Sequence, residues 1–154
     1  MSIAVFDIDG VVADVRHRLH HLERRPKDWI AFFAEAADDE PLSEGLALVA
    51  DLAERHEIAW LTGRPAWIRD ITAAWLRRYG LPAAQLHMRG DTDRRPARTY
   101  KLGALERMGE VAVFIDDDER VVAAAKGAGF PAVLADWVPR GDALRDAQDR
   151  IGRT

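Results

Sequence analysis

Short runs of hydrophobic residues alternate with longer amphipathic segments along most of the chain. Such runs occur at residues 3–6, 57–61 and 111–115, and each is followed at once by polar or glycine-containing sequence. Consecutive apolar residues bounded by turn signals are typical of strands buried on both faces of a sheet. Two shorter runs, at 85–88 and 132–134, predict two further strands.

The segments between these strands carry helical patterns. We expect helices at about residues 43–52, 66–79, 99–108, 118–127 and 142–151, with Ser43 and Thr99 as possible caps and Gly80 as a stop. Strands that alternate with helices predict an α/β fold: a Rossmann-like parallel sheet of about five strands with helices on both faces. We expect a single domain over residues 1–154, with a small helical flap at about 15–40.

Composition narrows the class of protein. The 154 residues are 48% hydrophobic and 31% charged, carry a formal net charge of −4 and include no cysteine. This excludes disulfides and thiolate metal sites, and it argues against a strongly basic, non-specific nucleic-acid binder. The first ten residues do not resemble a signal peptide, and no apolar run approaches the length of a membrane span. We therefore expect a soluble, cytoplasmic protein.

Charged and hydroxyl-bearing side chains directly follow three of the predicted strands. Asp7 and Asp9 follow the first, residues 62–64 follow the second, and residues 116–118 follow the fourth, while Lys101 lies in the helix before that strand. In an open α/β sheet, ligands bind beyond the carboxyl ends of the strands. Several carboxylates at one edge are unfavourable unless a cation neutralises them, and Mg²⁺ prefers such oxygen ligands. The sequence therefore predicts a Mg²⁺ site.

These motifs resemble those of the haloacid dehalogenase superfamily of phosphotransferases. The first motif is Asp7-Ile8-Asp9-Gly10, and the others, in order, are Thr62-Gly63-Arg64, Lys101 and Ile115-Asp116-Asp117. Together with residues 14–19, the stretch from Met88-Arg89 through 93–96 to Lys101 also resembles the phosphatase half of phage-type polynucleotide kinase. Ala97 departs from that pattern, in which an aspartate commonly follows the proline. No kinase P-loop is present in the sequence.

The resemblance implies a role for each motif residue. Asp7 is expected to attack phosphorus and form an aspartyl-phosphate, and Asp9 to act as general acid and then general base. Thr62 is expected to hold the phosphoryl group by its hydroxyl, and Lys101 to neutralise Asp7 and the phosphate. Mg²⁺ is expected to bind Asp7, the main-chain carbonyl of Asp9, and either Asp116 or Asp117, with Asp117 preferred.

Substrate contacts are expected from a backbone N–H in the loop of Gly63 and from three guanidinium groups, those of Arg64, Arg89 and Arg95. A guanidinium matches the geometry of a phosphate. Only about 50 residues separate Asp9 from Thr62, which leaves room for no more than a minimal cap. The site is therefore expected to be open, and openness permits both large and small substrates.

The sequence thus predicts a Mg²⁺-dependent phosphomonoesterase that acts on nucleotides or on nucleic-acid 3′-phosphate ends. A general small-molecule phosphatase or 5′-nucleotidase is the alternative enzyme. The alternative of another class is a phospho-acceptor or phosphate-binding module that does not turn over. Three further groups have plainer interpretations: Asp118 is expected to cap a helix, the aromatic stripe of Trp29, Phe32 and Phe33 to pack in a core, and His17, His20 and His21 not to form a zinc site.

Overall fold

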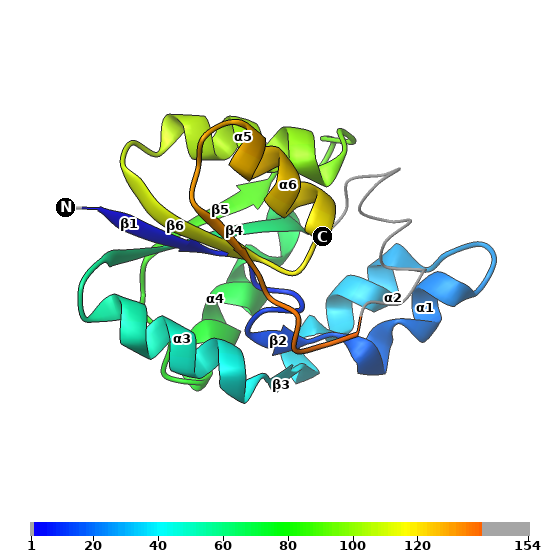
Figure 1. The fold of residues 1–154 in the computed structure, drawn as a ribbon. Coiled ribbons are helices and arrows are strands. Elements are labelled where there is room, and N and C mark those ends of the chain that lie inside the picture. The colour runs from blue at the N-terminus through cyan, green and yellow to red at the C-terminus, as the bar shows by residue number, and fades with distance from the viewer. Residues whose placement is uncertain (1, 140–154) are drawn as a thin grey trace.

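The computed structural model describes residues 2–139, so the helix expected at 142–151 lies outside the described residues. Within that part of the chain, a parallel five-stranded sheet has the strand order β5-β4-β1-β6-β7 (Figure 1). The predicted α/β class and the number of strands are confirmed. The strands are β1 (Ile3–Phe6), β4 (Glu57–Pro65), β5 (Gln85–Arg89), β6 (Val111–Asp116) and β7 (Ala132–Leu134).

Helices cover both faces of this sheet, as predicted. One face carries α3 (Ser43–Ala53) and α4 (Arg69–Arg78), and the other carries α5 (Ala97–Arg107) and α6 (Glu119–Gly127) (Figure 1). Side chains of β1 alternate between the two layers: Phe6 packs into the core on the α3 and α4 side, whereas Val5 packs into the core on the α5 and α6 side. Burial on both faces explains why β1 is an unbroken apolar run.

The expected flap lies beside the carboxyl ends of the central strands (Figure 1). Its strands β2 and β3 pair antiparallel at its base, and its aromatic residues Phe32 and Phe33 form a small core with Leu22, Ala36 and Ile68. The core-packing interpretation of Phe32 and Phe33 is therefore confirmed. The flap consists of β2 (Ala13–Asp14), η1 (Arg16–Arg18), α1 (His20–Glu23), α2 (Trp29–Ala34), η2 (Glu35–Asp38) and β3 (Glu40–Pro41), where η denotes a 3₁₀ helix.

Several local predictions differ from the structure. Ser43 is the first residue of α3 rather than its cap, because Leu42 occupies the N-cap position, and the Ser43 hydroxyl donates to Glu44. Helix α5 begins at Ala97, directly after Pro96, so Thr99 lies inside the first turn. Residues 62–64 belong to β4 itself. The pair β2 and β3 was not predicted, because two-residue strands are too short to show an alternating pattern.

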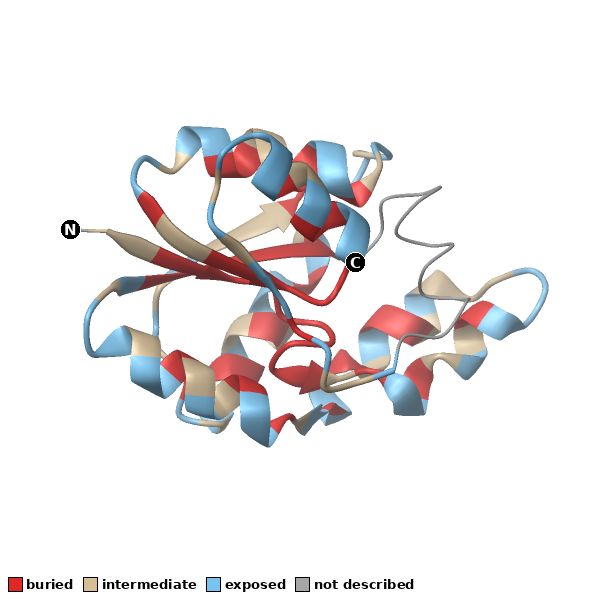
Figure 2. Cartoon of the chain, viewed as in Figure 1, coloured by how far each residue is buried: buried red, intermediate tan, exposed pale blue. Residues whose placement is uncertain are grey.

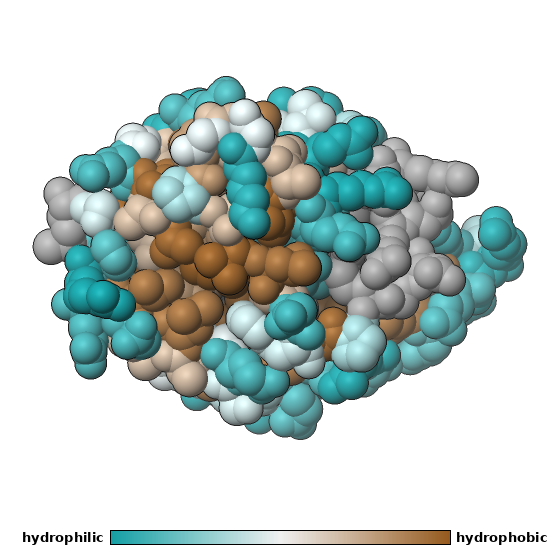
Figure 3. All heavy atoms as spheres, in the orientation of Figure 1, coloured by the Kyte–Doolittle hydropathy of each residue, from teal (hydrophilic) through white to brown (hydrophobic). Residues whose placement is uncertain are grey.

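Burial follows the layered arrangement, with the inner strands buried and the outer faces of the helices exposed (Figure 2). One face of the molecule shows a gathering of apolar side chains (Figure 3). Val133 and Leu134, on the edge strand β7, are 47% and 38% exposed. No helix within residues 2–139 is long and apolar enough to cross a membrane.

Candidate active site

The register of the sheet brings the predicted motifs to one edge. Phe6 of β1 pairs with Trp60 of β4 on one side and with Ile115 of β6 on the other. The residues that follow these positions, Asp7 and Asp116 among them, therefore lie at the same level of the sheet. Parallel strands deliver side chains in this way because their carboxyl ends coincide.

Lys101 connects two of these carboxylates from the first turns of α5. Its Nζ lies 2.6 Å from Oδ2 of Asp116 and 3.2 Å from Oδ1 of Asp7, and all three side chains are fully buried. Burial alone lowers the pKa of Lys101, but the charges of Asp116 and Asp7 outweigh it and hold the pKa above its usual value. The side chain is therefore a permanent cation beside Asp7.

Lys101 does not fully offset the cost of ionising the buried side chain of Asp7. Burial, reinforced by the charge of Asp116, raises its pKa from 3.8 to about 8, although Lys101 opposes the shift. A raised pKa means that the protein alone stabilises the carboxylate form of Asp7 less well than water does. A further positive charge at this position would stabilise the carboxylate.

The donor set around Asp7 fits a divalent cation. Carboxylate oxygens of Asp7, Asp116 and Asp117 lie within 4.8 Å of one another, and all three residues are buried. The oxygens of Asp116 already accept hydrogen bonds from Lys101 Nζ and from the N–H of Asp118. An all-oxygen, acidic set suits Mg²⁺. The expectation that Asp117 is the direct ligand after β6 stays a prediction.

Gly10 makes room for Asp117. A Cβ at residue 10 would lie 2.0 Å from Oδ2 of Asp117, and the φ of Gly10 is +78°. The left-handed backbone conformation favours glycine, and the close approach excludes any side chain. The glycine of the first motif thus allows the loop after β1 to pass directly beside the carboxylate of Asp117.

Asp9 is held by two arginines through a single oxygen. Its Oδ1 accepts from Nη2 of Arg64 at 2.6 Å, from Nε of Arg64 at 2.9 Å and from Nη2 of Arg18 at 3.3 Å. Its Oδ2 is buried and accepts no hydrogen bond from the described residues. Burial raises the pKa of Asp9, but the charges of Arg64 and then Arg18 outweigh it and leave the pKa below its usual value.

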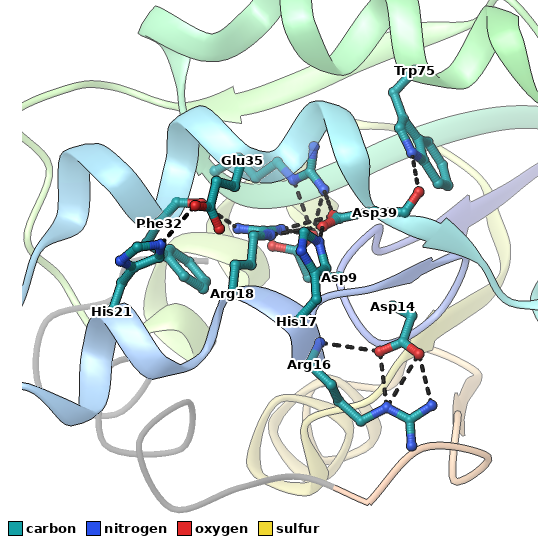
Figure 4. A network of polar contacts seen from close by, with 11 residues as sticks. Asp9, Asp14, Arg16, His17, Arg18, His21, Phe32, Glu35, Asp39 and Trp75 are labelled. Atoms are coloured by element: carbon teal, nitrogen blue, oxygen red, sulfur yellow. Dashed lines mark hydrogen bonds and ion pairs between the residues drawn. The ribbon is translucent and has the colours of Figure 1, made fainter.

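Asp39, at the end of the flap, binds the same two arginines, and Figure 4 shows it beside Arg18 and His17. It lies 2.8 Å from Arg18 Nε and 3.0 Å from Arg64 Nη2, and His17 Nε2 lies 2.6 Å from its Oδ1. Its main-chain carbonyl accepts from the indole N–H of Trp75 at 2.8 Å. Asp39 is fully buried. The flap is therefore joined to Asp9 by a buried network of alternating charges.

Sequence reasoning missed Asp39 and the role of Arg18. Neither residue belongs to a motif whose spacing indicates its role, and both lie in a mostly polar stretch of the sequence. Arg18 falls within residues 14–19, which were included in the resemblance, so that stretch carried the only signal. Arg64 was expected to contact substrate, but it is fully buried and its nitrogens bind Asp9, Asp39 and Thr72. This placement indicates that Arg64 positions Asp9.

Comparisons with known proteins agree with this geometry. Residues 1–135 match the family model described as the polynucleotide kinase PNKP phosphatase domain. The chain belongs to this family. It is a phosphatase domain of the haloacid dehalogenase superfamily, as the motifs predicted. A search of curated proteins found no match.

Solved structures share the fold of this phosphatase domain. A chain in the structure of the Pnkp1/Rnl/Hen1 RNA repair complex aligns with a TM-score of 0.71 and 22% identity, over 92% of this chain and 44% of that one. The putative HAD-hydrolase YfnB from Bacillus subtilis, bound to magnesium, aligns with a TM-score of 0.62 and 12% identity, over 86% of this chain and 87% of that one. The Class C acid phosphatase from Bacillus anthracis aligns with a TM-score of 0.62 and 16% identity, over 86% of this chain and 65% of that one. The phosphatase domain thus spans less than half of the first of these chains.

Thr62 of the phosphatase domain lies in β4, close to the network around Asp9. Its side chain is fully buried, and its Oγ1 accepts from the N–H of Arg64 at 3.1 Å. Because that oxygen accepts from the backbone, its hydroxyl hydrogen is left to donate elsewhere. Gly63, between them, is also buried. The predicted roles of Thr62 and Gly63 stay predictions.

Arg89 and Arg95 lie one strand further out, on β5 and the loop after it. The guanidinium of Arg89 lies 4.6 Å from the ring centre of Tyr100, and its Nη1 donates to the carbonyl of Arg95. Its Nε and Nη2 are buried and have no hydrogen-bond partner among the described residues, and burial lowers its pKa to about 10. Arg95 is exposed and pairs with Asp93 at 2.7 Å. An anion would satisfy Arg89, whereas Arg95 is already paired.

The histidines of the flap have other partners. His17 bonds to Asp39, and His21 Nε2 lies 2.9 Å from Glu35. With His20, the pair His21 and Glu35 forms a second group of potential metal-ligand atoms within 4.8 Å, a grouping that spacing did not suggest. Asp118, by contrast, acts as expected, because its side chain accepts from the N–H of Arg120 and caps α6.

Proposed function

We propose that this phosphatase domain is a Mg²⁺-dependent phosphomonoesterase that forms an aspartyl-phosphate on Asp7. The observation that carries the proposal is the buried contact of Asp7 with Lys101, 3.2 Å away, in a cluster that includes Asp116 and Asp117. Such a cluster has little structural use, because burying like charges costs stability. It is the arrangement expected when an anionic phosphoryl group and a metal complete the site.

In the first step, a carboxylate oxygen of Asp7 attacks phosphorus, and the bond to the ester oxygen breaks. Lys101 opposes the negative charge of the transferring group, and the Thr62 hydroxyl donates to one of its oxygens. Phosphoryl transfer depends chiefly on such positioning and charge stabilisation. The leaving oxygen takes a proton from Asp9, which becomes a carboxylate. The pKa of Asp9 is low in the free protein, and the negative charge of a phosphate bound beside it raises that pKa and favours the protonated form.

In the second step, the carboxylate of Asp9 accepts a proton from water, the water oxygen attacks phosphorus, and the bond to Asp7 breaks. Inorganic phosphate leaves, and Asp9 again carries a proton. Oδ2 suits both transfers, because Oδ1 is occupied by Arg64 and Arg18 while Oδ2 accepts no hydrogen bond. Help of this kind contributes on the order of 10²–10⁴ in rate.

Mg²⁺ would be held by the carboxylates of Asp7 and Asp117 and by the main-chain carbonyl of Asp9, with Asp116 behind them. When bound, the ion neutralises the cluster and polarises the phosphoryl oxygens. Asp116 keeps Lys101 in place through its 2.6 Å contact.

For substrate, we favour nucleotides or nucleic-acid 3′-phosphate ends. The family model is that of a polynucleotide kinase phosphatase domain, and the small flap leaves space for a polymer end. Arg89, with two buried nitrogens that lack partners, is the candidate for a further phosphate contact. A general small-molecule phosphatase or 5′-nucleotidase remains the competing enzyme, and Ala97 is the departure that favours it.

A phosphate-binding module that does not turn over is the competitor of another class. Asp9 argues against it, because a module that only binds phosphate has no need of a carboxylate held by two arginines two residues from the acceptor. Hydrolysis of p-nitrophenyl phosphate with Mg²⁺ distinguishes the two. We expect turnover that EDTA abolishes and that Asp7→Asn lacks. No release by the wild type, or equal release by Asp7→Asn, would favour the binding module.

The substrate is tested by comparing 3′-phosphorylated oligonucleotides, 3′- and 5′-mononucleotides and sugar phosphates at equal concentration. We expect the highest kcat/KM on the oligonucleotides or mononucleotides. A strong signal on sugar phosphates with a weak one on every nucleotide would replace the proposed substrate class by the small-molecule alternative.

A further inference from the structure

A hollow lined entirely by apolar side chains lies between the flap and the end of β4. Its volume is about 350 Å³, and its lining residues are Trp29, Ile30 and Phe33 of α2 with Trp67 of the following segment, η3 (Ala66–Ile68). We call these four residues the aromatic hollow. Ile30 is 75% exposed and Trp67 is 49% exposed. Single exposed apolar residues are ordinary, but a contiguous group on one concave surface marks a binding site.

The rings of Trp29 and Trp67 both pack against Phe33, and we call the space beside these rings the slot. Phe33 is buried, its ring lies stacked on Trp29 with centres 5.7 Å apart, and the Trp67 ring stands edge-on to it at 6.0 Å and 89°. The two tryptophans come from separate segments, so the slot exists only when the flap is packed on the sheet. Rings held in this way offer flat apolar surfaces with little freedom to lose on binding.

The aromatic hollow is joined to the phosphatase site through the backbone. Trp67 follows Pro65, the last residue of β4, and is five residues beyond Thr62. Five residues span at most roughly 18 Å when extended. A nucleic-acid strand with its terminal phosphate bound at Thr62 would therefore have its last few bases within reach of the aromatic hollow.

The neighbouring loop carries two arginines together with two aspartates, Asp91 and Asp93. The N–H of Trp67 donates to Asp91 Oδ1 at 3.0 Å, which ties the hollow to residues 90–96. That loop exposes Arg94 and Arg95. Arg95 is paired with Asp93, whereas Nη1 of Arg94 donates to the main-chain carbonyl of Asp91, so Arg94 is the positive charge that a backbone phosphate could contact. Positive charge beside aromatic rings is the combination by which proteins bind single strands, because every base has a face that can stack.

Size argues against a protein partner. A stable protein interface buries about 800 Å² on each side, far more than four side chains provide. A single planar ring needs only the slot. Apart from the two indole N–H groups, the side chains that line the hollow are apolar, so it would contact a ring mainly through its faces.

We propose that the aromatic hollow binds an unpaired nucleobase close to the phosphorylated end of the substrate, with Trp67 as the principal contact. The choice of a nucleobase as ligand rests on the proposed function. A base in a duplex is stacked on its neighbours and does not enter the slot, so single-stranded ends are the preferred substrates. Stacking tolerates all four bases, and the hollow therefore selects polymer ends over small phosphomonoesters without reading sequence.

The test compares two ligands and four proteins. The ligands are a 5′-fluorescein-labelled, 3′-phosphorylated oligothymidylate and the same strand with abasic residues at its last three positions. The proteins are the wild type, Trp67→Ala, Trp67→Phe and, as a control, Val133→Ala, which shortens a side chain of similar exposure on the distant edge strand β7. Anisotropy in EDTA gives Kd without turnover, and hydrolysis with Mg²⁺ gives kcat/KM.

We expect Trp67→Ala to weaken binding of the full oligonucleotide roughly 5- to 150-fold and to leave the abasic strand unchanged. Trp67→Phe should keep most of the affinity, and Val133→Ala should bind as the wild type does. Equal effects on both strands, or no effect on either, would overturn the proposal. If no protein hydrolyses any substrate yet the base-dependent difference in Kd persists, the hollow is supported and the proposed function fails instead.

Discussion

Nη2 of Arg64 lies 2.6 Å from Oδ1 of Asp9, and neither side chain has any exposed surface. The contact joins the second motif of the phosphatase to the first across two adjacent strands. The guanidinium occupies one oxygen of the carboxylate, and the proposed mechanism uses the other for proton transfer. In that mechanism Arg64 positions the acid–base residue Asp9.

Replacing Arg64 tests this positioning role. We expect Arg64→Lys, which keeps the charge but loses the two-pronged contact, to lower kcat on p-nitrophenyl phosphate by roughly 10- to 10³-fold, within the range that acid–base help contributes. Arg64→Ala also removes a charge that lowers the pKa of Asp9. The alkaline limb of its pH–rate profile, on which Asp9 loses the proton that it donates, should therefore move to higher pH. An unmoved limb would contradict the assignment, and Arg55→Lys, at an exposed pair with Asp51, serves as the control.

Asp39 should matter more for stability than its place in a flap suggests. Asp39→Ala leaves the buried guanidinium of Arg18 without its closest carboxylate and the Arg64 guanidinium with only Asp9. Removing one partner of a buried charge network costs about 3–5 kcal/mol. Urea unfolding measures this change. Asp38→Ala, at the exposed neighbouring position, should stay within about 0.5 kcal/mol of the wild type, and an equal effect at both positions would contradict the network.

We expect the ionised side chain of Asp7 to lower the stability of the metal-free protein. Its pKa is raised to about 8 by burial, so the unfolded chain ionises first, near 3.8, and the folded state keeps the proton. Stability of the metal-free protein therefore falls as pH rises from about 4 to about 8. We expect Asp7→Asn to raise Tm by several degrees at pH 8 in EDTA while abolishing turnover. A lower Tm for Asp7→Asn would show that Asp7 stabilises the fold.

The same raised pKa couples Mg²⁺ binding to protons. Below about pH 8 the ion competes with a proton on Asp7, because metal ligands must be deprotonated. We expect Mg²⁺ affinity to increase from pH 6 to pH 8 and then to level off. Calorimetry in buffers of different ionisation enthalpy should show proton release at pH 7. Affinity that is independent of pH, with no released proton, would place the ion away from Asp7.

Gly10 and Gly80 form a matched pair for testing the space beside Asp117. Both have positive φ, of 78° and 71°, but a Cβ at residue 10 meets the Asp117 carboxylate whereas one at residue 80 meets nothing within 4 Å. Gly80→Ala should lose about 1 kcal/mol through backbone strain, and Gly10→Ala should lose more, because its Cβ also meets the Asp117 carboxylate. Only Gly10→Ala should also lose Mg²⁺-dependent turnover, by at least about tenfold. Equal activity of the two variants would contradict the role of this contact.

Local patterns predicted the framework of the molecule. Buried parallel strands are continuous apolar runs, so β1 and β6 were visible directly, and the acidic and basic residues placed after them indicated where the site would form. Boundaries were less visible. Ser43 and Thr99 have the composition of caps, but neither occupies that position, because helix starts depend on backbone conformation that a residue type only favours.

The network around Asp39 was beyond such reasoning. Arg18, Asp39 and Arg64 are separated by 21 and 25 residues, and no period or motif relates them. They interact because the flap packs on the end of β4, which is decided by the fit of Phe32, Phe33 and Ile68 in one core. The same packing brings Trp67 to Phe33 and so creates the aromatic hollow.

The amino-acid sequence by itself determined the layered α/β architecture, the order of the strand-end motifs and the identity of the acidic cluster, because each is written in neighbouring residues. Only the tertiary structure decided that Arg64 faces Asp9, that Asp39 links the flap to the site and that Asp116 is occupied by Lys101. Those contacts join residues far apart in the chain, and long-range packing alone sets which buried charges meet.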